Sequence, residues 1–182
     1  MSKASEVIIL AEDRRQKNLS LGFLKRWGYR SGRIRVLPLP AGAGAGEQYV
    51  REHYPMQLEA LRRHREITAK ALIVLIDADR RTTAETRNHL DAQARGHGLA
   101  AVTPGEPVCL FIPRRHIETW VVCLRGEPAN EDDDYKARVQ DAEPQSAGHD
   151  FGHQILAGSN PPASWVQSLR DAIPEALRVP RE

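Results

Sequence analysis

Three apolar runs that each lead into acidic residues constrain the fold of this chain most strongly. The runs cover residues 7–11, 71–76 and 108–112. The acidic residues that follow them are Glu12, Asp77, Asp79 and Glu118. Each run is typical of a buried strand, and parallel strands place their carboxyl ends at one edge of a sheet. We therefore expect the four carboxylates to converge at the edge where open α/β folds bind ligands.

Strands and helices are predicted to alternate along the first two thirds of the chain. Strands are expected at residues 6–12, 34–39, 71–76 and 108–112. Helices are expected after Asp13 as far as Gly28, from about Glu47 to Arg65, from Thr82 to about Arg95, and after Pro113 as far as Leu124. Asp13 and Thr82 are suitable N-caps, and Gly28 is a suitable C-cap. This order predicts an α/β fold with a parallel, Rossmann-like sheet flanked by helices.

The last third of the chain has a different composition. Residues 126–162 are rich in Glu, Asp, Gly and Pro, and we expect them to form a loop-rich acidic segment. A final helix is expected at about residues 163–177, with Trp165, Leu169, Ile173 and Leu177 on its apolar face. The predicted organisation is therefore a catalytic domain at 1–125, with 126–182 packed on the same domain.

Composition and charge narrow the class of protein. The 182 residues carry a formal net charge of only +2, so the chain is not a generally basic nucleic-acid-binding protein. No apolar run reaches the length of a membrane span, and the first residues do not resemble a signal peptide, so we expect a cytoplasmic protein with no membrane partner. Cys109 and Cys123 have apolar neighbours and are expected to be core residues.

The acidic residues predict a site for a divalent cation. Asp77 and Asp79, two residues apart at a strand end, can share a metal ion, and Glu12 can complete its shell or act as a general acid or base. Oxygen ligands of this kind favour Mg²⁺ or Mn²⁺. Glu118 is expected to be an auxiliary ligand or to support the others. His116, nearby in sequence, is expected to make a local hydrogen bond.

Arginines flank the acidic residues. Arginine outnumbers lysine about four to one, and its planar fork suits phosphate oxygens. The candidate phosphate or nucleic-acid contacts are Arg14, Arg15, Arg80, Arg114 and Arg115. The alternative is that these arginines are solvated turn residues. Residues 41–46 alternate Ala and Gly without a Lys-Ser/Thr pair, so we expect a linker rather than a Walker A loop.

These residues resemble the TOPRIM superfamily, the catalytic domain of topoisomerases, primases and some nucleases. Glu12 matches the glutamate after the first strand of that superfamily, and Asp77 and Asp79 match its Asp-x-Asp. The segment 117–120, Ile-Glu-Thr-Trp, is similar to an element of small bacterial TOPRIM-like proteins. The resemblance covers residues 6 to about 124. At the position after Glu12, where these proteins often have glycine, this chain has Asp13.

The resemblance implies a Mg-dependent endonuclease of TOPRIM type. No tyrosine is placed as a topoisomerase nucleophile, so a nuclease fits best among the relatives. Several such relatives are anti-phage effectors encoded beside ATPases, which implies an ATPase partner. The small net charge also predicts that a partner or a homo-oligomer supplies part of the nucleic-acid surface. The alternative is a catalytically weak binding or regulatory subunit held on a larger ATPase. A receiver-like phospho-acceptor is disfavoured, because Pro113 and arginines follow the fourth strand instead of lysine.

Overall fold

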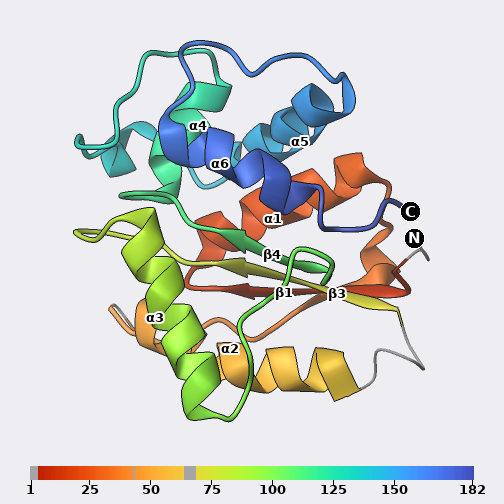
Figure 1. The fold of residues 1–182 in the computed structure, drawn as a ribbon. Coiled ribbons are helices and arrows are strands. Elements are labelled where there is room, and N and C mark those ends of the chain that lie inside the picture. The colour runs from red at the N-terminus through yellow and green to blue at the C-terminus, as the bar shows by residue number, and fades with distance from the viewer. Residues whose placement is uncertain (1–3, 43, 64–68) are drawn as a thin grey trace.

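Four parallel strands form the centre of the protein. A computed structural model describes residues 4–42, 44–63 and 69–182. Its strands are β1 (Glu6–Ala11), β2 (Ile34–Val36), β3 (Lys70–Leu75) and β4 (Val108–Phe111), in the order β2-β1-β3-β4 (Figure 1). Ala11 pairs with Leu75, and Leu75 pairs with Phe111, so β1, β3 and β4 end level with one another. The predicted α/β fold with a parallel, Rossmann-like sheet is confirmed.

Helices cover both faces of this sheet. On one face lie α1 (Arg14–Trp27), α4 (Ile117–Leu124), α5 (Glu143–Leu156) and α6 (Gln167–Ala176), and on the other α2 (Gly46–Arg63) and α3 (Thr83–Gly96) (Figure 1). Successive strand residues point to opposite faces, so Ile9 and Ile73 enter the first core whereas Ile8 and Leu72 enter the second. None of the helices in the described parts of the chain has the length and hydrophobicity needed to cross a membrane.

Local signals set the helix ends as predicted. The Asp13 side chain accepts a hydrogen bond from the backbone N–H of Gln16 at 2.9 Å, which caps α1. Gly28 ends that helix with φ of 109°, a conformation that glycine adopts without strain. Thr82 and Glu85 form the predicted capping box of α3. Helix α2 is described as far as Arg63, and the last two residues of its predicted range, 64 and 65, lie outside the described residues.

The prediction of a loop through residues 126–162 is wrong for α5. Glycines that suggest a loop in the sequence instead allow α5 to lie directly against α1. A Cβ atom on Gly22 would be 1.8 Å from the carbonyl oxygen of Gln145, and one on Gly148 would be 1.9 Å from that of Leu19. Phe151 of α5 is fully buried in the core shared with Val7 and Phe111. The last third of the chain is therefore integral to the same core.

The predicted apolar face of the last helix is also partly wrong. Trp165 precedes α6, and Leu177 is 55% exposed. The buried face contains Leu169, Ala172 and Glu175. Glu175 is buried there because β4 is an edge strand, which leaves backbone N–H groups without a partner strand. The backbone N–H of Leu110 donates to Glu175 Oε2 at 3.0 Å.

Candidate functional site

The carboxyl ends of β1 and β3, the region that we call the crevice, are the place where open α/β folds of this order bind ligands. These neighbouring strands are followed by α1 and α3, which leave toward opposite faces of the sheet. Where successive connections diverge in this way, the loops separate and leave room for a ligand. Glu12 directly follows β1, and Asp77 follows β3 by two residues.

Glu12 and Asp77 are in direct contact in this crevice. The backbone N–H of Asp77 donates to Glu12 Oε1 at 2.8 Å. The backbone N–H of Glu12 donates to Gln16 Oε1 at 3.0 Å, so α1 holds the start of this loop. Asp77 is 8% exposed, and its Oδ1 is buried with no hydrogen-bond partner among the described residues. A buried carboxylate oxygen without a donor is costly, so it calls for a ligand or for a small rotation toward Gln16. The buried Nε2 of Gln16 also lacks a partner in the described part of the chain, and the Gln16 side chain lowers the pKa of Asp77.

The two carboxylates are not neutralised by a basic side chain. Within the described residues, no lysine or arginine nitrogen lies within 4 Å of either one, and the nearest basic group is His116. Burial, followed by the charge of Asp77, raises the pKa of Glu12 to about 9. Burial, followed by the charges of Asp13 and Glu118, raises the pKa of Asp77 well above its usual value. Near neutral pH the pair therefore has to take up a proton or a cation.

His116 and Asp79 lie at the mouth of the crevice. His116 Nδ1 is 3.6 Å from Asp79 Oδ1 and 3.9 Å from Asp77 Oδ2, and it has no hydrogen-bond partner among the described residues. The expectation of a local hydrogen bond for His116 is therefore wrong at this nitrogen. Burial, followed by the charge of Lys136, lowers the pKa of His116, which keeps the ring neutral. Asp79 has φ of 54°, a conformation that is uncommon for residues other than glycine.

Glu118 reaches the same region but is neutralised by arginine. Its side chain is 4% exposed, and Arg15 Nη1 donates to its Oε1 at 2.6 Å. Arg15 also donates to Asp141 Oδ1 at 3.2 Å and to the carbonyl oxygen of Val139 at 2.9 Å. The guanidinium group of Arg15 is thus used inside the protein rather than presented to a phosphate, contrary to its predicted role. Of the other predicted carboxylates, Glu12 and Asp77 are in contact, and Asp79 is connected to Asp77 through His116.

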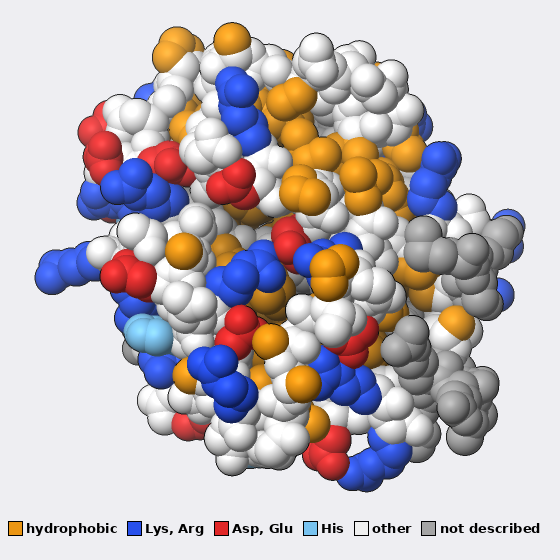
Figure 2. Space-filling model, viewed as in Figure 1, with side chains coloured by type: hydrophobic (Ala, Val, Ile, Leu, Met, Phe, Trp, Pro, Cys, Tyr) orange, Lys and Arg blue, Asp and Glu red, His pale blue; other side chains and the backbone are white. Residues whose placement is uncertain are grey.

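A cleft of about 750 Å³ opens beside the carboxylates. Its lining contains three of the predicted arginines together with residues from α2, from the loops after β3 and β4, and from the connection between α4 and α5. The lining residues are Glu47, Asp79, Arg80, Arg81, Thr82, Arg114, Arg115, His116, Glu131 and Asp132. Arg14 is exposed at the start of α1 and is not one of them. Figure 2 shows acidic and basic side chains side by side on the left of the molecule, where the strands of Figure 1 end.

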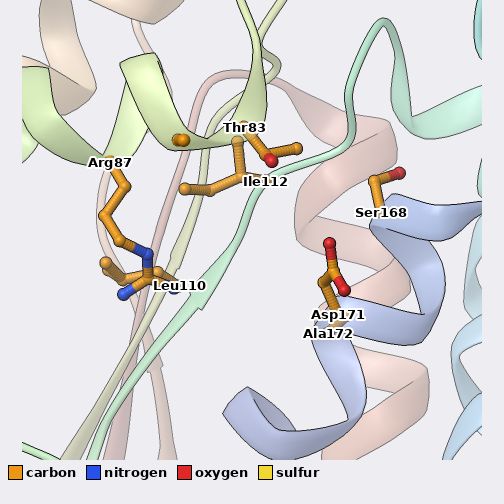
Figure 3. Close-up of a pocket in the computed structure, with 8 residues that line it drawn as sticks. Thr83, Arg87, Leu110, Ile112, Ser168, Asp171 and Ala172 are labelled. Atoms are coloured by element: carbon orange, nitrogen blue, oxygen red, sulfur yellow. The ribbon is translucent and has the colours of Figure 1, made fainter.

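A second cavity of about 270 Å³ lies along the edge of β4, between α3 and α6. Leu110 and Ile112 line its floor, and Thr83, Ser168 and Asp171 face it from the helices (Figure 3). Its arginine is already paired, because Arg87 lies 2.8 Å from Glu175. Glu12 and Asp77 do not line this cavity, so it is separate from the crevice.

The crevice suits a hard divalent cation in its donor chemistry. Asp77 offers an unpartnered oxygen, and Glu12 lies against it with one oxygen free of the Asp77 N–H. In the described ranges, no group of three or more acidic, histidine or cysteine side chains surrounds a common metal position. Two protein oxygens with water in the remaining positions is a usual arrangement for Mg²⁺, which dehydrates reluctantly. The residues therefore fit Mg²⁺ or Mn²⁺, with Asp79 at the mouth.

Two residues of the site are absent from the predicted set. Gln16 is fully buried and supports Glu12 from α1. Gly46, the first residue of α2, lies so close to Glu12 that an added Cβ would be 2.7 Å from the Cβ of Glu12. In the sequence, Gly46 is recognisable only as the last glycine of the Ala-Gly segment. Its role depends on the contact with Glu12, which is 34 residues away in the chain.

Comparisons of the chain with models of protein families, with curated proteins and with solved structures found no match. The resemblance to the TOPRIM superfamily therefore depends on the residues of the crevice and on the order of the elements.

Proposed function

We propose that this protein is a metal-dependent nuclease that hydrolyses nucleic-acid phosphodiesters. The observation that carries the proposal is the contact between the partly buried Glu12 and the buried Asp77. Neither carboxylate has a lysine or arginine nitrogen within 4 Å among the described residues. Together with the TOPRIM resemblance of Glu12, Asp77 and Asp79, this pair favours Mg²⁺ or Mn²⁺ as the cofactor. The adjoining cleft, with Arg80, Arg114 and Arg115 in its lining, supports a phosphate-containing substrate.

The residues of the crevice have distinct roles in this proposal. Asp77 and Glu12 would hold the cation, with Asp79 contributing from the mouth. A bound Mg²⁺ or Mn²⁺ polarises a phosphoryl oxygen and lowers the pKa of a coordinated water. Glu12 would act as the general acid or base, because only one of its carboxylate oxygens accepts from the Asp77 N–H and the other is free to exchange a proton. Arg114 and Arg115 would bind phosphate and offset the charge that develops in the transition state.

The cellular part of the proposal depends on the resemblance alone. TOPRIM-like relatives imply an effector of bacterial anti-phage defence, active in the cytoplasm with an ATPase partner or as a homo-oligomer. Glu118 in this proposal is a supporting residue that orders Arg15, because its charge is already neutralised.

Cleavage of labelled single-stranded and duplex DNA and RNA by the purified full chain tests the proposal. We expect cutting with Mg²⁺ or Mn²⁺, none with EDTA, and a loss of at least about 10²-fold in Asp77→Asn. The matched control is Glu59→Gln, which removes an exposed carboxylate on α2 and should cut normally. Equal cutting by Asp77→Asn, or cutting that persists in EDTA, would contradict the proposal. Metal binding without any cutting would favour the regulatory subunit instead.

A further inference from the structure

We propose that Asp132 is a built-in competitor that occupies the arginine side of the cleft and that nucleic-acid phosphate must displace. This inference depends on the proposed function, because it describes how the same cleft is regulated. The acidic segment 131–134 connects α4 to α5 and contributes two residues, Glu131 and Asp132, to the lining of the cleft.

Asp132 and Glu131 place acidic oxygens against the predicted phosphate contacts. Asp132 Oδ1 is 3.5 Å from Arg114 Nη2, and Glu131 Oε2 is 4.0 Å from Arg114 Nη1. Arg115 Nη1 donates to the carbonyl oxygen of Asp132. Carboxylate and phosphate oxygens use the same donors of a guanidinium group. The two arginines therefore face acceptors of the kind that a substrate would supply.

The backbone of this segment is held firmly at several points. Glu131 Oε1 accepts from the backbone N–H of Ser168 at 2.8 Å, which ties the segment to α6. Asn130 Oδ1 accepts from the backbone N–H groups of Asp132 and Asp133, each at 2.9 Å. The buried Tyr135 accepts from the backbone N–H of Asn130 at 3.0 Å. The segment is thus a fixed support rather than a moving lid.

The Asp132 side chain is free to leave although its backbone is fixed. Its side chain is 82% exposed, so rotation about its own bonds removes the carboxylate from Arg114 without unfolding the segment. Asp133 has the same charge but a different environment, because its Oδ2 accepts from Asn130 Nδ2 at 2.7 Å. Asp132 is therefore the residue that a phosphate would displace.

His116 is the residue that joins the cleft to the carboxylate pair. His116 lines the cleft, and its Nδ1 and the Oδ1 of Asp77 are buried without a hydrogen-bond partner in the described chain. A phosphate on Arg114 and Arg115 would bring the polynucleotide next to these groups.

Binding of a labelled single-stranded oligonucleotide, and of the matching duplex, to full-chain variants tests the inference. All variants carry Asp77→Asn, so cutting does not disturb the measurement. Asp132→Asn should bind about two- to fivefold more tightly at about 0.1 M salt, the range expected for release of an exposed ion pair. Asp133→Asn changes the net charge equally and should stay within about 1.5-fold of the parent, because Asn130 holds the Asp133 carboxylate and no arginine nitrogen of the described residues lies within 4 Å of it. Adding Arg114→Gln to Asp132→Asn should remove the gain.

The outcomes separate this inference from the proposed nuclease activity. Equal effects of Asp132→Asn and Asp133→Asn, weaker binding by Asp132→Asn, or no binding by any variant would each overturn the competitor role. Cutting is measured separately in proteins with Asp77 intact. If none of these cuts while Asp132→Asn still binds selectively more tightly, the nuclease activity is lost but the competitor role remains. If the proteins with Asp77 intact cut, and Asp132→Asn and Asp133→Asn bind equally well, the nuclease activity remains but the competitor role is lost.

Discussion

The carboxylates in the interior of this molecule differ in whether an arginine neutralises them. Glu106, before β4, is 6% exposed and forms hydrogen bonds of 2.6 and 2.9 Å with Arg62. Glu175, on α6, is paired with Arg87 in a similar way. In contrast, Glu12 and Asp77 lie against each other at the other end of the sheet, with no arginine or lysine nitrogen within 4 Å in the described part of the chain.

This contrast separates a structural role from a functional one. The hydrogen bonds from Arg62 lower the pKa of Glu106, so its charge is stabilised in the folded protein. Burial raises the pKa of Asp77, so its charge is destabilised by the fold. A protein keeps such a cost at sites where a ligand compensates for it. Among the acidic residues that the structure describes, the uncompensated pair is therefore the best guide to function.

The largest expected effect is on the free energy of unfolding, which Glu106→Gln and Asp77→Asn should change in opposite directions. Glu106→Gln removes the charge that balances Arg62 and should destabilise the protein by about 2–3 kcal/mol. Asp77→Asn removes an uncompensated buried charge and should stabilise the metal-free protein by about 1–2 kcal/mol. Urea unfolding of both variants in EDTA measures the difference.

Cleavage should follow the opposite order. Glu106→Gln should still cut at temperatures where it is folded, whereas Asp77→Asn should not. If Asp77→Asn is as destabilising as Glu106→Gln, the two carboxylates do not differ in the way described.

The next effect is a pH dependence that only the crevice should show. The pKa of Glu12 is raised from 4.5 to about 9, so the folded protein binds a proton that the unfolded chain releases. Its contribution to stability is therefore fully present below about pH 4.5 and is lost as pH rises toward 9. Compared with Glu12→Gln, the metal-free wild type should lose stability across this range. Thermal unfolding at a series of pH values, with EDTA, measures it.

Added Mg²⁺ should reverse this loss. The cation replaces the proton on the carboxylates, so its stabilising effect should grow with pH and reach about 3 kcal/mol at a hundredfold excess over its Kd. Asp77→Asn should abolish the Mg²⁺ effect. A Mg²⁺ effect that is independent of pH, or unchanged in Asp77→Asn, would place the cation elsewhere.

The smallest effect concerns the support of Glu12. In Gly46→Ala, the new methyl group would lie 2.7 Å from the Cβ of Glu12, so Glu12 has to move. We expect about a tenfold loss of cleavage, because catalysis is sensitive to small displacements. Stability should fall by about 1–3 kcal/mol, because the methyl group also crowds the backbone of Glu12. The control is Gly32→Ala, where an added Cβ meets nothing within 4 Å. Equal rates for Gly46→Ala and Gly32→Ala would show that Glu12 tolerates the shift or does not take part.

Much of the local structure was predictable from the sequence. The apolar runs that became β1, β3 and β4 are continuous, and the caps at Asp13, Gly28 and Thr82 depend only on neighbouring residues. Such signals act over a few residues, so a sequence contains them in full. The proximity of Glu12 and Asp77 was also predictable, because parallel strands carry their C-terminal residues to one edge.

The sequence by itself thus determined the order of strands and helices as far as Leu124, the caps of α1 and α3, and the edge at which the carboxylates meet. Only the tertiary structure decided which carboxylates are neutralised: Arg15 pairs with Glu118, 103 residues away, and leaves Asp77 uncompensated. The tertiary structure also packs the glycines of α5 against α1 and places Asp132 next to Arg114. These outcomes depend on distances between segments far apart in the chain, and local propensity contains no information about such distances.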